Sequence, residues 1–262
     1  MFRRLHLFEF NDQPWLPQFM TAWMTRVLNV CHEQSQDGRV WAVKVRELIE
    51  KSGQTRIVDL CSGGGGPVLQ MAKVLREEHG IDVHVTLTDF IPNLQSAAEI
   101  NGTRKDVVYI TDSINATDVP NHLLGIRTAF SGLHHLRQKD ARALLKNAFD
   151  NRQCIFLGET TTRSFQAIVM YTCAARYFGD LARQTTLTPK QSFFTYRLPV
   201  LPLMLGWDNV VSCCRTYSAR ELRKLIQPLT ASDYRWELGS LCNPALCIRY
   251  PYIMGYPVMP SH

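Results

Sequence analysis

The sequence predicts an α/β protein built on a doubly wound, mostly parallel seven-stranded sheet that ends in an antiparallel hairpin. Short β-branched runs alternate with amphipathic helical patterns between residues 54 and 159, which is typical of right-handed βαβ units. Near the C-terminus two apolar runs are separated by Cys242 to Pro244 alone, which indicates a hairpin at the sheet edge. Hydrophobic residues fill 45% of the 262 positions, enough for a substantial core.

The borders of each element follow from local signals. The β-branched and alternating runs predict strands at residues 56–61, 82–90, 106–111, 125–131 and 153–159. Amphipathic patterns predict helices at residues 67–80, 92–101 and 138–149, and the first is opened by Pro67 and closed by Gly80. A last helix is expected from Ser218, followed by the hairpin strands at residues 233–241 and 245–256.

The chain is expected to divide into four parts. Residues 54–159 make a Rossmann-like core, which residues 218–262 complete with a helix and the hairpin. Residues 160–217 are too many for an ordinary connection between a strand and a helix, so they predict an inserted helical lid. Residues 1–53 predict an N-terminal helical cap.

Charge and cysteine content exclude several classes of protein. The net charge of +6 comes from scattered lysines and arginines without a polybasic run, so no nucleic-acid partner is expected. Eight cysteines without a CxxC pair, and no signal-like pattern at the N-terminus, favour the cytoplasm and argue against a metal site. The most apolar stretch, residues 198–207, is short and contains two prolines, so no membrane span is predicted.

Four consecutive glycines, residues 63–66, stand between the first predicted strand and its helix. Glycine is costly to order and a plain turn requires one or two, so the run indicates close approach of the backbone to a ligand. In a doubly wound sheet this loop lies at the carboxyl ends of the strands, where ligands bind. The GxGxxG dinucleotide spacing fails because Val68 stands at the third glycine position, and no GK[ST] follows for a P-loop.

The stretch "VDLCSGGGG" resembles the first motif of class I S-adenosylmethionine-dependent methyltransferases, with Cys61 at the position of the first glycine. The resemblance covers residues 54–159 and the C-terminal hairpin, and it implies S-adenosyl-L-methionine as the cofactor. It places the cofactor against six residues of the loop, namely Asp59, Cys61, Ser62, Gly63, Gly64 and Gly65.

Further positions resemble the family pattern in the same order along the chain. Asp89 ends the second predicted strand, where the family places the carboxylate that binds the ribose hydroxyls, and Phe90 would lie on the adenine. Asp112 and Ser113 resemble the element that meets the adenine amino group. Ser131 lies in "AFSGLHHL", which resembles the segment at the methyl-transfer region. Asp89 as a helix cap and Asp112 as a turn former remain open.

Candidates for catalysis and acceptor binding lie in three places. His134 and His135 stand in the segment at the methyl-transfer region, where an imidazole could remove a proton from the acceptor, with a packed helix-start residue as the alternative. Glu159 ends the fifth strand and could orient an amine or hydroxyl, or be a solvated loop carboxylate. Aromatic residues of the N-terminus and the lid, Trp15 and Trp207, are expected to border the acceptor.

The N-terminal stretch "FEFNDQPWLP" mixes Glu9 and Asp12 with aromatic residues. Such a mixture could cover the cofactor or hold a cationic substrate. A segment that is simply docked on the core is the alternative.

The expected reaction is methyl transfer to an oxygen or nitrogen of a small-molecule acceptor by in-line displacement. The donor is already activated, so the protein has to align the reactants and requires neither a metal nor a covalent residue. Residues 129–136 contain neither the Asn/Asp-Pro-Pro-aromatic motif nor the Pro-Cys pair of nucleic-acid enzymes. An inactive cofactor-binding partner or regulatory protein and a nucleic-acid methyltransferase remain the alternatives.

Overall fold

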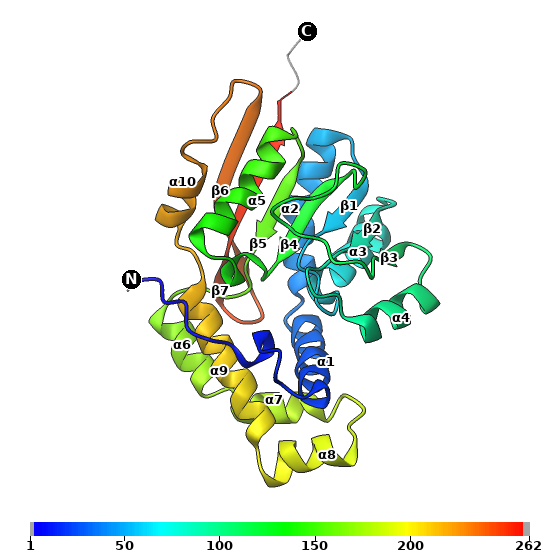
Figure 1. The fold of residues 1–262 in the computed structure, drawn as a ribbon, viewed down its shortest axis with the longest axis vertical. Helices are drawn as coiled ribbons and strands as arrows, with labels where there is room; N and C mark the ends of the chain where they lie inside the picture. Colours follow the sequence, from blue (N-terminus) through cyan, green and yellow to red (C-terminus); the bar gives the residue numbers. More distant parts are fainter. Residues whose placement is uncertain (1–2, 259–262) are drawn as a thin grey trace.

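The computed structural model describes residues 3–258, which form one mixed sheet with helices on both faces and a helical cap at one edge (Figure 1). The strand order is β3-β2-β1-β4-β5-β7-β6. Strands β1 to β5 are parallel, β7 is antiparallel to β5, and β6 is antiparallel to β7. The bounds of β1 to β7 are Arg56–Asp59, His84–Leu87, Val107–Tyr109, Ile126–Phe130, Ile155–Gly158, Tyr234–Asn243 and Ile248–Pro257. The predicted fold class is confirmed.

Two apolar cores hold helices on the faces of the sheet. On one face α2 (Asp37–Ser52), α3 (Gly66–His79) and α4 (Leu94–Thr103) pack on the strands. On the other face lie α5 (Gln138–Asp150) and α10 (Ala219–Ile226). Burial of apolar surface contributes about 25 cal/mol per Å² to the free energy of folding. The two helix layers therefore stabilise the sheet, and with it the strand ends at which the site lies.

Local signals end the helices as expected, and the hairpin turn lies slightly later than predicted. Gly80 ends α3 in the left-handed conformation, with φ 66°, which glycine adopts without strain. A capping box with Glu221 begins α10 at Ser218. The predicted turn at residues 242–244 is displaced to residues 244–247, because Asn243 still pairs with Ile248 in the sheet.

A third core belongs to the cap. Helix α1 (Gln18–Gln34) packs with α6 (Phe165–Thr172), α7 (Ala175–Ala182) and α9 (Val200–Arg215) around the buried Trp23. The short α8 (Pro189–Ser192) and the π-helical turn η3 (Phe193–Arg197) complete the insertion. We call α1 and these insertion helices the cap. The N-terminal helices therefore divide between two cores, since α1 joins the insertion whereas α2 packs on the sheet.

The segment before α1, which includes the short helix η1 (Phe10–Asp12), runs along α9 (Figure 1). Asp208 of α9 accepts the backbone N–H groups of Phe10 and Asn11 at 2.7 and 2.9 Å. The Arg4 guanidinium donates to the backbone carbonyl of His134, in the turn η2 (Leu133–His135) after β4, at 2.9 Å. The N-terminal segment thus ties the cap to the carboxyl end of the sheet.

Among residues 3–258, no helix is long and apolar enough to cross a membrane.

Candidate active site

The four glycines between β1 and α3 meet two different requirements. Gly63 and Gly65 have positive φ angles of 52° and 83°, a conformation that favours glycine. Gly64 and Gly66 instead let α1 approach the loop: a Cβ on Gly64 would lie 2.5 Å from Thr25 Cγ2, and one on Gly66 would also press against this helix. Two glycines are thus required by backbone conformation and two by the cap.

Cys61 has the backbone conformation that a glycine would adopt. Its φ is 57°, and Gly132 after β4 lies so close that a Cβ there would be 3.0 Å from the Cys61 Cβ. Burial raises the pKa of the Cys61 thiol to about 12, so the thiol is uncharged at neutral pH. The contact with Gly132 joins the glycine loop to the segment that carries His134 and His135.

Asp59 lies buried beneath the glycine loop and anchors it. Its carboxylate accepts hydrogen bonds from Ser62 Oγ at 2.7 Å and from Thr128 Oγ1 at 2.6 Å. Burial raises the pKa of this carboxyl to about 7, although both hydrogen bonds lower it. Asp59 and Ser62 therefore shape the loop from below, and direct cofactor contact by either stays a prediction.

The remaining residues predicted for a nucleoside gather at the carboxyl ends of β2 and β3. Asp89 accepts the N–H of Gly63 at 2.8 Å, so its carboxylate faces the glycine loop. Ser113 Oγ donates to the carbonyl of Phe90 at 2.6 Å, and the Phe90 ring is 63% exposed. Asp112 is exposed beside them. We call the glycine loop, residues 61–66, together with Asp89 the cradle; the structure brings its residues together, and their individual roles stay predictions.

A cavity of about 140 Å³ lies at the ends of β4 and β5, under the cap. Its lining is largely polar and includes Glu9, Ser131, His134, His135, Asp208 and Ser212. Met24, Leu28 and Leu205 of the cap helices add apolar surface. Ser131, predicted to contact the cofactor, shares a hydrogen bond of 2.6 Å with Thr160 at this rim. The walls come from distant parts of the chain, so the cavity depends on the assembled cap.

His134 and Glu159 form a buried pair in the cavity wall. The Glu159 carboxylate accepts the backbone N–H of His134 at 2.9 Å and lies 2.6 Å from its Nδ1. Because a carboxylate accepts hydrogen bonds, Nδ1 carries the proton and Nε2 is left as the basic nitrogen. Nε2 is buried and has no hydrogen-bond partner among residues 3–258. Glu159, predicted to orient the acceptor, is therefore placed to act through His134.

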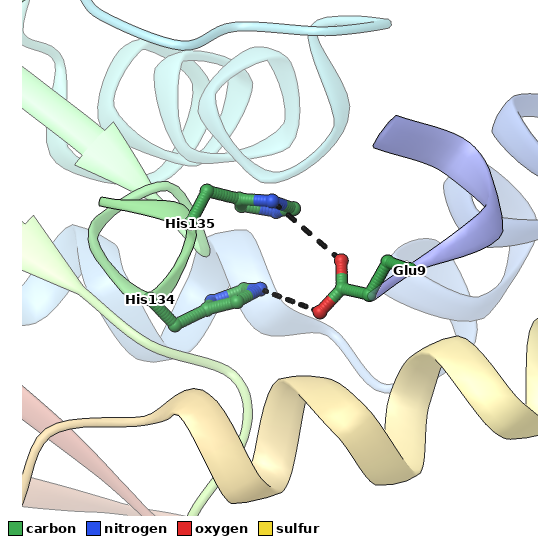
Figure 2. A group of neighbouring side chains, drawn as sticks. All are labelled: Glu9, His134 and His135. Atoms are coloured by element: carbon green, nitrogen blue, oxygen red, sulfur yellow. Dashed lines mark ion pairs between the residues drawn. The ribbon is translucent and has the colours of Figure 1, made fainter. Parts of the chain in front are cut away.

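Glu9 faces both histidines from one side (Figure 2). Its carboxylate oxygens are 3.9 Å from His134 Nε2 and 3.6 Å from His135 Nδ1. Burial raises the pKa of Glu9 to about 7, although the charges of His135 and of Arg215, 3.2 Å away, act in the opposite direction. This carboxyl can therefore exchange a proton near neutral pH.

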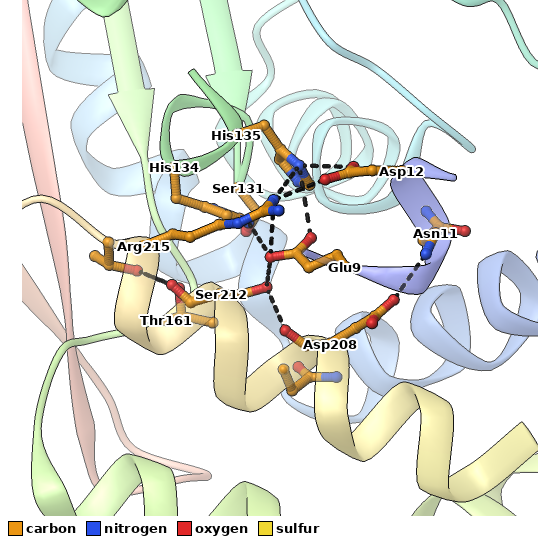
Figure 3. A network of polar contacts seen from close by, with 12 residues as sticks. Glu9, Asn11, Asp12, Ser131, His134, His135, Thr161, Asp208, Ser212 and Arg215 are labelled. Carbon is orange, nitrogen blue, oxygen red and sulfur yellow. Dashed lines mark hydrogen bonds and ion pairs between the residues drawn. The ribbon is translucent and has the colours of Figure 1, made fainter. Parts of the chain in front are cut away.

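Arg215, at the end of α9, organises the wider network (Figure 3). Its Nη1 lies 3.2 Å from Glu9 and 2.7 Å from Asp12. Burial raises the pKa of Asp12, but hydrogen bonds with His135 and Arg215 outweigh burial and hold that pKa below its usual range. Burial raises the pKa of Asp208, on the same helix, to about 6. The cavity is thus surrounded by groups that titrate over very different pH ranges.

Glu9, His134 and His135 also have the composition of a metal site, because their ligand atoms all lie within 4.8 Å of one another. Arg215 Nη1, however, is 3.2 Å from Glu9 and 3.4 Å from His135 Nδ1. A divalent cation among these ligands would meet that fixed positive charge at short range. The donor set fits acid–base chemistry better than a metal ion.

Sequence reasoning missed a second histidine–carboxylate pair, His32 with the buried Asp37, which also lines the cavity. His32 Nδ1 lies 2.7 Å from Asp37 Oδ2. Asp37 Oδ1 accepts hydrogen bonds from Tyr250 Oη at 2.7 Å and Asn243 Nδ2 at 2.9 Å. The available signal was a histidine and an aspartate five positions apart across the break between two helical patterns, which is too common to single out a site.

The two tryptophans predicted to border the acceptor are absent from the cavity lining among the described residues. Trp15 is 63% exposed and packs edge-on against Phe10, with ring centroids 6.3 Å apart. The Trp207 indole N–H donates to the backbone carbonyl of Phe8 at 3.0 Å. The Trp15 ring packs within the N-terminal segment and the Trp207 ring fastens that segment to the cap, so neither of the two reaches the cavity.

Comparison with known proteins identifies the fold. No family model and no curated protein matches the chain. Among solved structures, the plantazolicin methyltransferase BpumL in complex with SAH is similar, with a TM-score of 0.56 and 10% sequence identity over 95% of this chain and 92% of that chain. The same enzyme with SAH and a monoazolic desmethylPZN analog gives a TM-score of 0.55 and 10% identity over 93% and 91% of the two chains. Given this likeness and the strand order, the chain has the fold of the class I S-adenosylmethionine-dependent methyltransferases.

Proposed function

We propose that this protein transfers a methyl group from S-adenosyl-L-methionine to an oxygen or nitrogen atom of a small molecule held in the cavity. The observation that carries the proposal is the juxtaposition of two built sites. The cradle and the cavity occupy adjacent strand ends, and Gly132 in van der Waals range of Cys61 joins them. A confined cavity of about 140 Å³ favours a small acceptor group over a nucleic-acid strand.

The cradle has the features that a nucleoside cofactor requires. Gly63 leaves open space where a side chain would stand, and the Asp89 carboxylate next to it is half-buried and can accept hydrogen bonds from ribose hydroxyls. The exposed Phe90 ring offers an apolar platform for a base. Asp112 and Ser113 stand at the rim. Cofactor contacts by these residues are part of the proposal.

In this mechanism the cofactor supplies an activated methyl group on a sulfonium sulfur. His134 Nε2 takes the proton that the acceptor loses, and Glu159 holds the imidazole in the tautomer that makes this nitrogen basic. Alignment of two reactants in one site can lower the barrier by about 7 to 11 kcal/mol, and helices of the cap, which wall the cavity with Met24, Leu28 and Leu205, limit the access of water to a bound acceptor. His135, whose Nδ1 lies 3.0 Å from Asp12, packs against His134 with ring centroids 4.2 Å apart and completes this side of the cavity wall.

Titration calorimetry of the purified protein tests cofactor binding. S-adenosylmethionine and S-adenosylhomocysteine should bind, whereas nicotinamide dinucleotides should give no heat. Absence of both heat and thermal shift with millimolar S-adenosylhomocysteine would refute the proposal. Binding without turnover of any acceptor would instead favour a regulatory protein.

We also infer a cytoplasmic location. All eight cysteines are free thiols in the structure, including the adjacent Cys213 and Cys214. Free thiols persist in reducing compartments. Localisation of a fluorescent fusion with cell fractionation would test this inference.

A further inference from the structure

We infer that the acceptor group entering the cavity is a protonated aliphatic amine, an inference that rests on the methyl transfer proposed above. An ammonium group carries one positive charge and three N–H donors. The cavity presents negative charge and unpaired acceptor atoms, and this combination carries the inference.

The charge of the cavity lining is one-sided. Three buried carboxylates line it, those of Glu9, Asp37 and Asp208, with exposures of 3%, 2% and 5%. Within residues 3–258, no lysine or arginine belongs to the lining. Arg215 lies outside the lining, with Nη1 2.7 Å from Asp12 and 3.2 Å from Glu9, and offsets part of this negative charge. Among the described residues, the lining itself therefore offers acidic side chains and no permanently charged basic one.

The hydrogen-bonding groups point to the same ligand. His134 Nε2 is a buried acceptor without a hydrogen-bond donor in the described part of the chain, and a buried acceptor left unpaired destabilises the protein until a ligand pairs it. Glu9 lies beside it and accepts a hydrogen bond from Ser212 Oγ at 3.0 Å (Figure 3). An ammonium between His134 and Glu9 would donate to both, whereas a carboxylate would be repelled and an alcohol would supply a single donor.

His134 and Glu159 account for the proton that the ammonium must lose before methyl transfer. The ammonium gives one proton to His134 Nε2, which becomes an imidazolium supported by Glu159. The free amine lone pair forms the new N–C bond as the C–S bond breaks, and the electrons of that bond remain on sulfur. The product is an N-methylammonium ion, and the imidazolium later returns its proton to water.

A matched set of probes tests the inference on the full-length protein saturated with S-adenosylhomocysteine. Pentylammonium, 1-pentanol and hexanoate share a similar apolar chain, which Met24, Leu28 and Leu205 can contact. Calorimetry should show pentylammonium binding at least tenfold more tightly than either of the other two. Equal affinities, or no binding of pentylammonium, would overturn the inference.

Variants then place the binding in the cavity. Glu9→Gln and Asp208→Asn should each weaken pentylammonium binding at least fivefold while S-adenosylhomocysteine binding changes less than twofold. Glu77→Gln, at an exposed acid of α3, is the matched control and should change neither. Unchanged amine binding in both cavity variants would reject the site. Failure of the wild-type protein to bind S-adenosylhomocysteine would reject the proposed function, a result that is distinct from the probe comparison.

Discussion

The cradle and the cavity lie side by side at the carboxyl edge of the sheet, yet they are built in opposite ways. The cradle consists of residues 61–66 and Asp89, and its shape depends mainly on the backbone conformation of one loop and on the Gly63 N–H bond to Asp89. The cavity collects Glu9, His134 and Asp208 from three distant segments. The comparison teaches that a site made of backbone can be read from a short motif, whereas a site made of side chains depends on tertiary assembly.

The largest expected effect separates the two regions by function. His134→Ala should lower the turnover number about 10²- to 10⁴-fold, the usual contribution of a general base, while S-adenosylhomocysteine affinity changes less than twofold. Steady-state kinetics with calorimetry measures both. His122→Ala, at an exposed loop residue, is the control. An equal loss of cofactor affinity in a folded His134 variant would contradict the division between cradle and cavity.

The converse experiment addresses the cradle. Asp89→Ala should weaken cofactor binding by about 2 to 4 kcal/mol, because it removes a charged acceptor from two hydroxyls that each contribute about 1.5 to 3 kcal/mol before losses. Calorimetry measures the dissociation constant, and Asp82→Ala, an exposed residue before β2, provides the comparison. An unchanged constant in the folded Asp89 variant would show that the ribose site lies elsewhere.

A pH experiment tests how deeply the cavity carboxylate is buried. The folded-state pKa of Glu9 is about 7 against an ordinary 4.5, so Glu9 favours the folded state below pH 4.5, and that contribution is lost as the pH rises to 7. The loss should be about 2 to 3 kcal/mol. Relative to wild type, Glu9→Gln should therefore gain that much in free energy of unfolding between pH 4.5 and pH 8. Denaturant titrations at both pH values measure it; a difference independent of pH would argue that Glu9 is solvated.

The smallest expected effect concerns the contact between cap and cradle. Gly64→Ala should destabilise the fold by about 1 to 3 kcal/mol because the new methyl group would overlap Thr25 Cγ2, 2.5 Å away. Thr25→Ser in the same protein should restore part of the loss. Gly102→Ala, which meets nothing within 4 Å, serves as the control in thermal unfolding. Additive effects of the two substitutions would show that they do not interact.

The sequence was informative where a local rule decides the structure. The parallel strands follow from the alternation and the antiparallel pair from the hairpin, and Gly80 and Ser218 end and begin their helices as predicted. His134 and Glu159 were both recognised as candidates from their positions at strand ends. Glu159 can fix the tautomer of His134 because β4 and β5 are neighbours in the sheet. Hydrophobic periodicity does not specify that neighbourhood.

Other parts of the site could not be predicted because their partners are far apart in sequence. Asp208 is the single charged residue at the end of the otherwise apolar stretch of residues 198–208, and its buried role needs the N–H groups of Phe10 and Asn11, about 200 positions away. Trp15 and Trp207 were singled out for their size, but they pack outside the cavity. Aromatic content does not reveal which side of a lid faces the ligand.

Helix α1 contacts both regions, and this has a thermodynamic consequence. Thr25 lies against Gly64 of the cradle, while Met24 and Leu28 line the cavity. A ligand that shifts this helix from either side changes the affinity of the other side, and the coupling must be reciprocal. If the bound nucleoside changes the affinity for the acceptor by some factor, the bound acceptor changes the affinity for the nucleoside by the same factor. A titration of one ligand in the presence and absence of the other would therefore measure the coupling free energy between the two sites that α1 connects.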